Sequence, residues 1–139
     1  MLHEAARAVL LPKPETPTLP CAFSSCHTDK IKKAQLVLDT TVTDLRATLV
    51  GKAACEAPNL KLVDATGGDA GLAKSWLWIK LAATGEMIPP DPSWGTPGSC
   101  GQMGAMDYGV RMPYGGGMWE DTKLAAVKAW ICAGAPGPM

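Results

Sequence analysis

The stretch Cys21-Ala22-Phe23-Ser24-Ser25-Cys26-His27 places two thiols five positions apart and an imidazole directly after the second thiol. Three ordinary explanations exist for such a group. Cys21 and Cys26 can close a small disulfide loop, the three residues can belong to a zinc site, or the thiols can be free and buried. The disulfide is the strongest of these, and a zinc site is disfavoured because no second Cys/His cluster has metal-ligand spacing.

A fourth explanation is chemical attachment of a cofactor. The stretch is C-x4-C-H, a longer-spaced form of the C-x-x-C-H pattern of c-type haem attachment. In that chemistry two thiols add to the haem vinyl groups and the adjacent histidine binds the iron. The two extra residues of the spacer then have to bulge outward. The stretch predicts haem attachment at Cys21 and Cys26 and iron binding by His27.

Composition supports a small domain that needs reinforcement. The chain has 139 residues, enough for one domain. Apolar residues make up 47% and charged residues 19%, which excludes a disordered polyelectrolyte. Fifteen glycines and twelve prolines predict extensive loops. A loop-rich domain of this size usually gains stability from disulfides, a metal or a cofactor.

Charge and hydropathy limit the partners. Thirteen basic residues balance thirteen acidic ones, so nucleic acid is not an expected partner. The sequence contains no run of 18 apolar residues, so no transmembrane segment is predicted. The first residues show no signal peptide. Because covalent cysteine chemistry belongs mostly to exported proteins, we expect a mature chain of periplasmic, extracellular or cell-surface location.

The prolines suggest how the chain is divided. Residues 1–20 are predicted to be a tail with up to two helical turns, ending in a proline-rich strap from Pro12 to Pro20. The domain itself is expected over residues 21–136. Residues 137–139 are expected to be a C-terminal tail.

Periodicity predicts four short helical pieces and little strand, an all-α class. The pieces are a helix or turn at 21–33, a helix at 43–50 stopped by Gly51, a helix at 69–81, and a last helix that starts at 120–122 and ends before Gly134. Leu45 and Leu49 are expected on one face of the second piece. The last helix is expected to bury a stripe of Leu124, Val127 and Ile131, with Trp130 beside it. Residues 85–118 form a long irregular stretch. Because structureless loops of this length are uncommon, we expect this one to wrap a ligand or to act in function.

A haem iron bound by one histidine has a sixth position. Met112 is the first candidate, because Pro113 stiffens the loop around it and a thioether is a soft iron ligand. Met106 is the second candidate. His3 is a distant third, because the strap would have to fold back or reach another subunit. Other methionines are more often core filler.

Taken in order, the segments of the chain resemble monohaem cytochrome c-like domains, most closely exported ones with the long C-x4-C-H spacer. The segments are 21–27, LVLD at 36–39, LVG at 49–51, SWLWIKL at 75–81, RMPYGG at 111–116 and AWICAGA at 129–135. The resemblance covers residues 20–136. It implies an all-α cytochrome c-like fold around one haem c, held by Cys21 and Cys26, with His27 and Met112 as axial ligands.

Three cysteines remain outside the motif, so at most one disulfide forms among them. Cys55 and Cys100 both lie in predicted loops, where a cross-link restrains the unfolded chain most. Cys132 lies near the end of the last helix. We favour Cys55–Cys100 over Cys100–Cys132, although spacing does not settle the connectivity.

Two functions from different classes follow. The first is electron transfer by one haem to redox protein partners, with the option that the chain is a subunit of a larger membrane-associated complex. The alternative is a haem-free, disulfide-stapled binding or structural module of an exported complex. An enzyme is not expected, since no triad, phosphate loop or carboxylate pair is present. A peroxidase-like activity would require an open sixth site.

Overall fold

The structure is a computed structural model, and it describes residues 1–11, 38, 42–97, 108–112 and 119–139. Within these ranges the regular elements are helices, joined by isolated β-bridges. This content is compatible with an all-α class. The stretch 21–33, including Cys21, Cys26 and His27, lies outside the described residues, as does Cys100.

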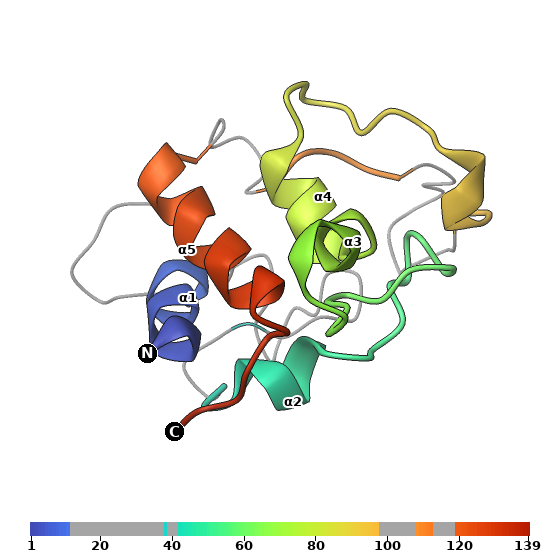
Figure 1. Ribbon diagram of the computed structural model, residues 1–139. Coiled ribbons are helices and arrows are strands. Elements are labelled where there is room, and N and C mark those ends of the chain that lie inside the picture. Colours follow the sequence, from blue (N-terminus) through green and yellow to red (C-terminus); the bar gives the residue numbers. More distant parts are fainter. Residues whose placement is uncertain (12–37, 39–41, 98–107, 113–118) are drawn as a thin grey trace.

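The first helix packs directly against the last one. Helix α1 (Leu2–Leu10) lies beside α5 (Asp121–Cys132), and both chain ends lie on the same side of the molecule (Figure 1). Residues His3, Ala6 and Leu10 follow helical spacing and are buried. The helix ends before Pro12, which disfavours a helical residue at position 11.

The prediction that residues 1–20 are a tail and that the domain begins at Cys21 is therefore wrong for the first ten residues. Helix α1 contributes Ala6, Leu10 and the following Leu11 to the main hydrophobic core. An alanine-rich helix of nine residues is marginal alone, so its stability comes from packing its apolar face on α5.

Helix α2 (Leu45–Leu49) agrees with the expected position. Its N-cap is Asp44, whose carboxylate accepts a hydrogen bond from the amide of Ala47 at 3.1 Å. Leu45 and Leu49 are both buried on one face, as predicted. Gly51 follows with a φ of +74°, the left-handed conformation expected of the residue that stops this helix.

The helix predicted over 69–81 is in fact two helices, α3 (Gly68–Ala73) and α4 (Trp76–Ala82). The break has a tertiary cause. The amides of Trp76 and Leu77 donate to the carbonyls of Lys61 and Leu62, at 2.9 and 3.0 Å, instead of to the preceding helical turn. The hydroxyl of Ser75 donates to the carbonyl of Gly71 and accepts from the amide of Asp64. Thus the 61–64 segment separates the two helices.

Helix α5 confirms the predicted last helix and its buried stripe. Leu124, Val127, Trp130 and Ile131 are all buried, and Gly134 ends the helix with a φ of +82°. Helices α3 and α4 pack on α5 from the side opposite α1 (Figure 1). A second, smaller apolar cluster lies among the loops beyond α4.

Candidate functional site

Met112, the predicted sixth ligand, lies in the short segment 108–112. Backbone hydrogen bonds hold this segment on two sides. On one side the amide of Met112 donates to the carbonyl of Lys80 in α4 at 2.9 Å. On the other, the amide of Arg111 donates to the carbonyl of Glu86 at 2.7 Å. The Met112 side chain is half-buried and packs on the main core. Its position is thus determined by α4 and by the chain that follows it.

The segment also forms an antiparallel bridge between Met87 and Val110. The amide of Ile88 donates to the carbonyl of Gly109 at 3.2 Å. Gly109 has a φ of +74°, which favours glycine. Residues 86–88 and 108–112 therefore pair like two short strand pieces beside α4.

Lys80 and Glu56 form a buried ion pair next to this segment. Their Nζ and Oε2 atoms are 3.2 Å apart, and the side chains are only 6% and 12% exposed. The Lys80 ammonium also donates to the carbonyl of Tyr108 at 3.1 Å and lies 5.6 Å from the ring centroid of Trp76. Lys80 falls on the same face as Trp76 in the sequence pattern. A charged residue on an apolar stripe is the sequence signal for such a buried pair, although the sequence does not identify the partner.

Three aromatic rings pack edge to face in the smaller cluster. The ring centroids of Trp76, Trp94 and Tyr108 are 5.1 to 5.9 Å apart. The Tyr108 hydroxyl lies 2.6 Å from the carbonyl oxygen of Gly95 and 2.9 Å from that of Asp91. It can donate its proton to either, so the tyrosine ties the segment 108–112 to the loop around η2 (Pro92–Trp94).

That loop is further held by Asp91. Its carboxylate accepts hydrogen bonds from the hydroxyl and the amide of Ser93, at 2.7 and 2.9 Å. These bonds favour the charged form, so the pKa of Asp91 lies below its ordinary value. These two hydrogen bonds thus hold the exposed loop in a short turn at Asp91 and Ser93.

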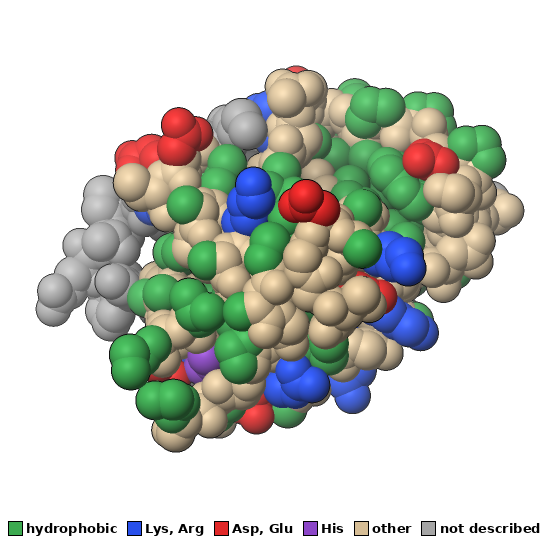
Figure 2. All heavy atoms as spheres, viewed as in Figure 1, with side chains coloured by type: hydrophobic (Ala, Val, Ile, Leu, Met, Phe, Trp, Pro, Cys, Tyr) green, Lys and Arg blue, Asp and Glu red, His purple; other side chains and the backbone are tan. Residues whose placement is uncertain are grey.

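An apolar cavity of about 610 Å³ opens beside the loop. Its lining residues are Met87, Ile88, Pro89, Pro90, Pro92, Pro97 and Tyr108. In Figure 2, hydrophobic side chains gather in the region where Figure 1 places the chain after α4. The volume falls in the range of small-molecule sites, but the lining is almost wholly apolar.

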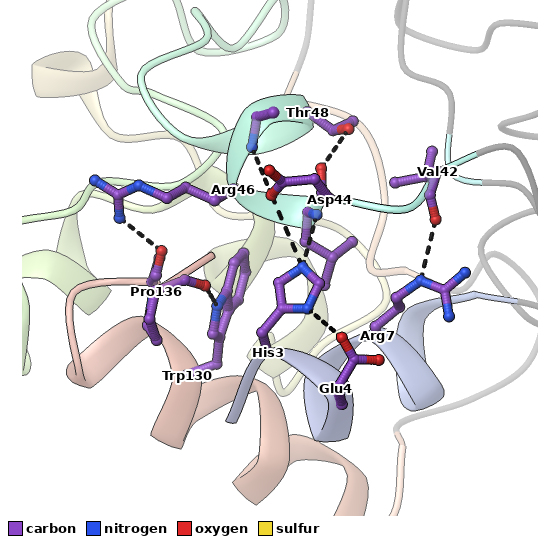
Figure 3. Close-up of polar contacts among 12 residues, drawn as sticks. His3, Glu4, Arg7, Val42, Asp44, Arg46, Thr48, Trp130 and Pro136 are labelled. Atoms are coloured by element: carbon purple, nitrogen blue, oxygen red, sulfur yellow. Dashed lines mark hydrogen bonds and ion pairs between the residues drawn. The ribbon is translucent and has the colours of Figure 1, made fainter. Parts of the chain in front are cut away.

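His3 is a structural residue in the core between α1 and α2 (Figure 3). Its Nε2 accepts a hydrogen bond from the amide of Leu45 at 2.9 Å, which leaves the ring proton on Nδ1, bonded to Glu4 at 2.8 Å. The bond from His3 also lowers the pKa of Glu4. The imidazole is 1% exposed and lies edge-on to Trp130. With both nitrogens engaged, His3 is not available to a metal in this fold.

Two cysteines lie within the described residues. Cys55 is disulfide-bonded and Cys132 carries a free thiol. A Cys100–Cys132 disulfide is therefore excluded in this fold. The partner of Cys55 lies outside the described residues, and the Cys55–Cys100 pairing stays a prediction.

The remaining predicted site residues, Cys21, Cys26 and His27, also lie outside the described residues, as does Met106. The structure thus positions the Met112 side of the expected site only. Elsewhere in the described ranges, no three His, Cys, Asp or Glu side chains are grouped so that they could hold a metal ion. Among the described helices, none has the length and hydrophobicity that a membrane span requires.

Comparison with known proteins adds no assignment. No family model, no curated protein and no solved structure matches the chain. The functional argument therefore rests on the residues and their contacts.

Proposed function

We propose that the protein is an electron carrier with one covalently attached c-type haem, bound through Cys21 and Cys26 and ligated by His27 and Met112. The observation that carries the proposal is the fixed position of Met112, whose segment is bonded to α4 and to the chain after it. An axial thioether has to be presented by a backbone that does not move away from the iron. The C-x4-C-H stretch supplies the attachment chemistry.

The donor set fits a low-spin haem iron. An imidazole and a thioether are the ligands of cytochromes that transfer electrons, and the thioether raises the reduction potential. Among the other candidates in the described ranges, His3 uses both ring nitrogens and Met87 is 57% exposed. Met112 is half-buried on the core, which would keep water from its sulfur.

In this proposal a bound haem would supply one-electron redox chemistry, and no bond of a substrate would be made or broken. The chain's residues do the rest. Cys21 and Cys26 would hold the group, the helical core would exclude water from it, and His27 and Met112 would set its potential. The partners would be redox proteins. The location would be an oxidising compartment, such as the periplasm or cell surface, which also suits the disulfide at Cys55.

The attachment test compares two sets of cysteine variants. The purified protein should absorb in the Soret band, keep its haem through acid-acetone extraction and exceed the chain mass by one haem. A variant with both Cys21→Ala and Cys26→Ala should lose covalent haem. Cys132→Ala, which removes a free thiol from α5, should retain it. A chain of bare mass with a Cys21–Cys26 disulfide would overturn the proposal.

The ligand test compares two methionines. Met112→Ala should abolish the weak far-red sulfur-to-iron band of the oxidised protein and lower the potential. Met87→Ala removes an exposed thioether from the neighbouring loop and should leave the band unchanged. A band that survives in Met112→Ala would transfer the ligand role to another residue, with Met106 as the next candidate.

The haem-free, disulfide-stapled module is a second candidate, and the disulfide at Cys55 favours it. The chain has five cysteines and Cys132 is free, so Cys55 pairs with Cys21, Cys26 or Cys100. Peptide mapping under non-reducing conditions separates the cases. A Cys55–Cys100 link leaves both motif thiols for haem. A link from Cys55 to Cys21 or Cys26 would leave only one, and would support the module.

A further inference from the structure

We propose that the buried Lys80–Glu56 pair is the positioning device of the Met112 segment, with Lys80 as its central residue. The inference rests on the proposed function, because it concerns how Met112, the proposed sixth iron ligand, is held. Its structural part concerns only contacts among described residues.

Lys80 contacts the segment 108–112 at both ends. Its backbone carbonyl accepts the amide hydrogen of Met112, and its side-chain ammonium donates to the carbonyl of Tyr108, at 2.9 and 3.1 Å. A single residue of α4 therefore spans the segment. Because the ammonium bond holds the first residue and the carbonyl bond holds the last, Lys80 restrains the segment at both ends, while residues 86–88 pair with it along its other side.

Glu56 determines where the ammonium points. A lysine side chain is long and has many rotamers, and its head is normally drawn to water. Here the ammonium is held by the Glu56 carboxylate at 3.2 Å and lies near the Trp76 ring. Glu56 itself follows Cys55, whose disulfide restrains the local backbone. The pair thus has a fixed anchor on a different part of the chain.

Gly109 shows that the segment is fitted to the pair. A Cβ at this position would lie 2.7 Å from the Lys80 ammonium and would overlap the Glu56 carboxylate. The backbone of the segment therefore lies directly against both charged groups. A methyl group at this position would fit only if the ends of these two side chains moved.

Stability alone does not account for such a pair. Taking two charges out of water is costly, and replacing a buried pair by apolar residues is often neutral or stabilising. A buried pair is better understood where it specifies one arrangement over others. The arrangement specified here is the position of the segment 108–112, which carries Met112.

The decisive variant removes both charges together. Lys80→Met alone would leave a buried carboxylate unpaired and could unfold the protein. The double variant Lys80→Met with Glu56→Gln removes both charges of the pair, so neither is left unpaired, and it should fold. It keeps the Lys80 backbone carbonyl but removes the side-chain bond to Tyr108. Lys128→Met is the matched control, because it removes an exposed lysine of α5.

Amide hydrogen exchange gives the readout that does not depend on haem. In the double variant we expect the amides of Arg111 and Met112 to exchange at least about tenfold faster, while Leu124 in α5 exchanges at the rate of the parent protein. Lys128→Met should change neither. Unchanged exchange at Arg111 and Met112 in the folded double variant would overturn the proposal.

The spectrum tests the link to the ligand. If haem is bound, the double variant should keep its Soret band and lose or weaken the far-red band. The single variant Lys80→Arg, which retains a positively charged hydrogen-bond donor, should keep part of the far-red band that the double variant loses. A full far-red band in the double variant would show that the pair does not position the sulfur. If no haem is bound, the proposed function fails, and the exchange experiment alone decides whether the pair holds the segment.

Discussion

The two apolar clusters of this protein are stabilised in different ways. The larger one joins the helices α1 to α5 and is made mainly of leucine, valine and tryptophan side chains on helix faces. The smaller one joins loops around Trp76, Trp94 and Tyr108, where backbone hydrogen bonds, a buried ion pair and a fitted glycine hold the chain. The first depends on area buried, whereas the second depends on individual polar contacts.

This difference bears on how the proposed ligand Met112 is held. Non-directional burial tolerates small shifts of a helix, whereas hydrogen bonds and close backbone approach specify position. The predicted ligand Met112 packs its side chain on the larger cluster, but its backbone is held by the contacts beside the smaller one. The two clusters should therefore respond differently to substitution.

The largest effect is expected from Trp130→Ala in the larger apolar cluster. Trp130 is fully buried, lies against His3, and donates its Nε1 proton to the carbonyl of Pro136 at 2.8 Å. Removing the indole should lower the free energy of unfolding by about 3–5 kcal/mol. Denaturant unfolding measures this, with Lys128→Ala on the exposed side of α5 as the control. A loss under about 1 kcal/mol would mean that α5 is not the centre of the core.

Gly109→Ala, in the smaller cluster, should have the next largest effect. Comparing it with Gly51→Ala separates the cost of a left-handed backbone from the cost of the contact with the Lys80–Glu56 pair. Gly51 has the same φ of +74° but nothing within 4 Å of an added Cβ. We expect Gly51→Ala to lose about 1–2 kcal/mol from the left-handed backbone. Gly109→Ala should lose about 2–4 kcal/mol, because the added methyl also displaces the Lys80–Glu56 pair. Equal losses in the two variants would remove the evidence that the segment is fitted to the pair.

His3→Leu tests whether the first ten residues belong to the core. The substitution keeps an apolar side chain between α1 and α2 but leaves the buried amide of Leu45 without its acceptor. The free energy of unfolding should fall by about 1–3 kcal/mol. Ala5→Gln, on the exposed face of α1, should have little effect. Were residues 1–20 a tail, both variants would be silent.

Asp91→Asn should give the smallest effect, and one that depends on pH. The hydroxyl and amide of Ser93 hold the pKa of Asp91 below its unfolded value of 3.8 in the folded protein. The carboxylate therefore stabilises the fold above that pH, and the contribution is lost as the pH falls through the lower, folded value. Parent and Asp91→Asn should differ slightly at pH 7 and converge in strong acid. Asp69→Asn serves as the control, and a difference that grows on acidification would contradict the assignment.

The helices could be predicted where the apolar residues and end signals that define them lie close together in the sequence. The stripe of α5 and the stop of α2 at Gly51 agree with the sequence prediction, because spacing and a left-handed glycine are properties of neighbouring residues. The predicted single helix over 69–81 was wrong, because the amides of Trp76 and Leu77 bond to a segment fifteen residues earlier. Such a competitor is invisible to periodicity.

The candidate site divides in the same way. Sequence spacing alone supplied the C-x4-C-H stretch and the Met-Pro pair, both of which are local patterns. It did not reveal that Lys80 contacts both ends of the Met112 segment, since these residues are 28 and 32 positions apart in the chain. A lysine on an apolar helix face signals a buried partner, but it does not identify Glu56 as that partner.

The sequence by itself determined which chemistry the chain can offer: two thiols and an imidazole in one stretch, a thioether before a proline, and a loop-rich domain of balanced charge. These are fixed by residue type and local spacing. The tertiary structure decided that α1 is part of the core, that His3 uses both ring nitrogens, and that an ion pair lies against Gly109. Burial and long-range hydrogen bonds exist only after distant segments meet, so these properties are not present in any stretch of the sequence.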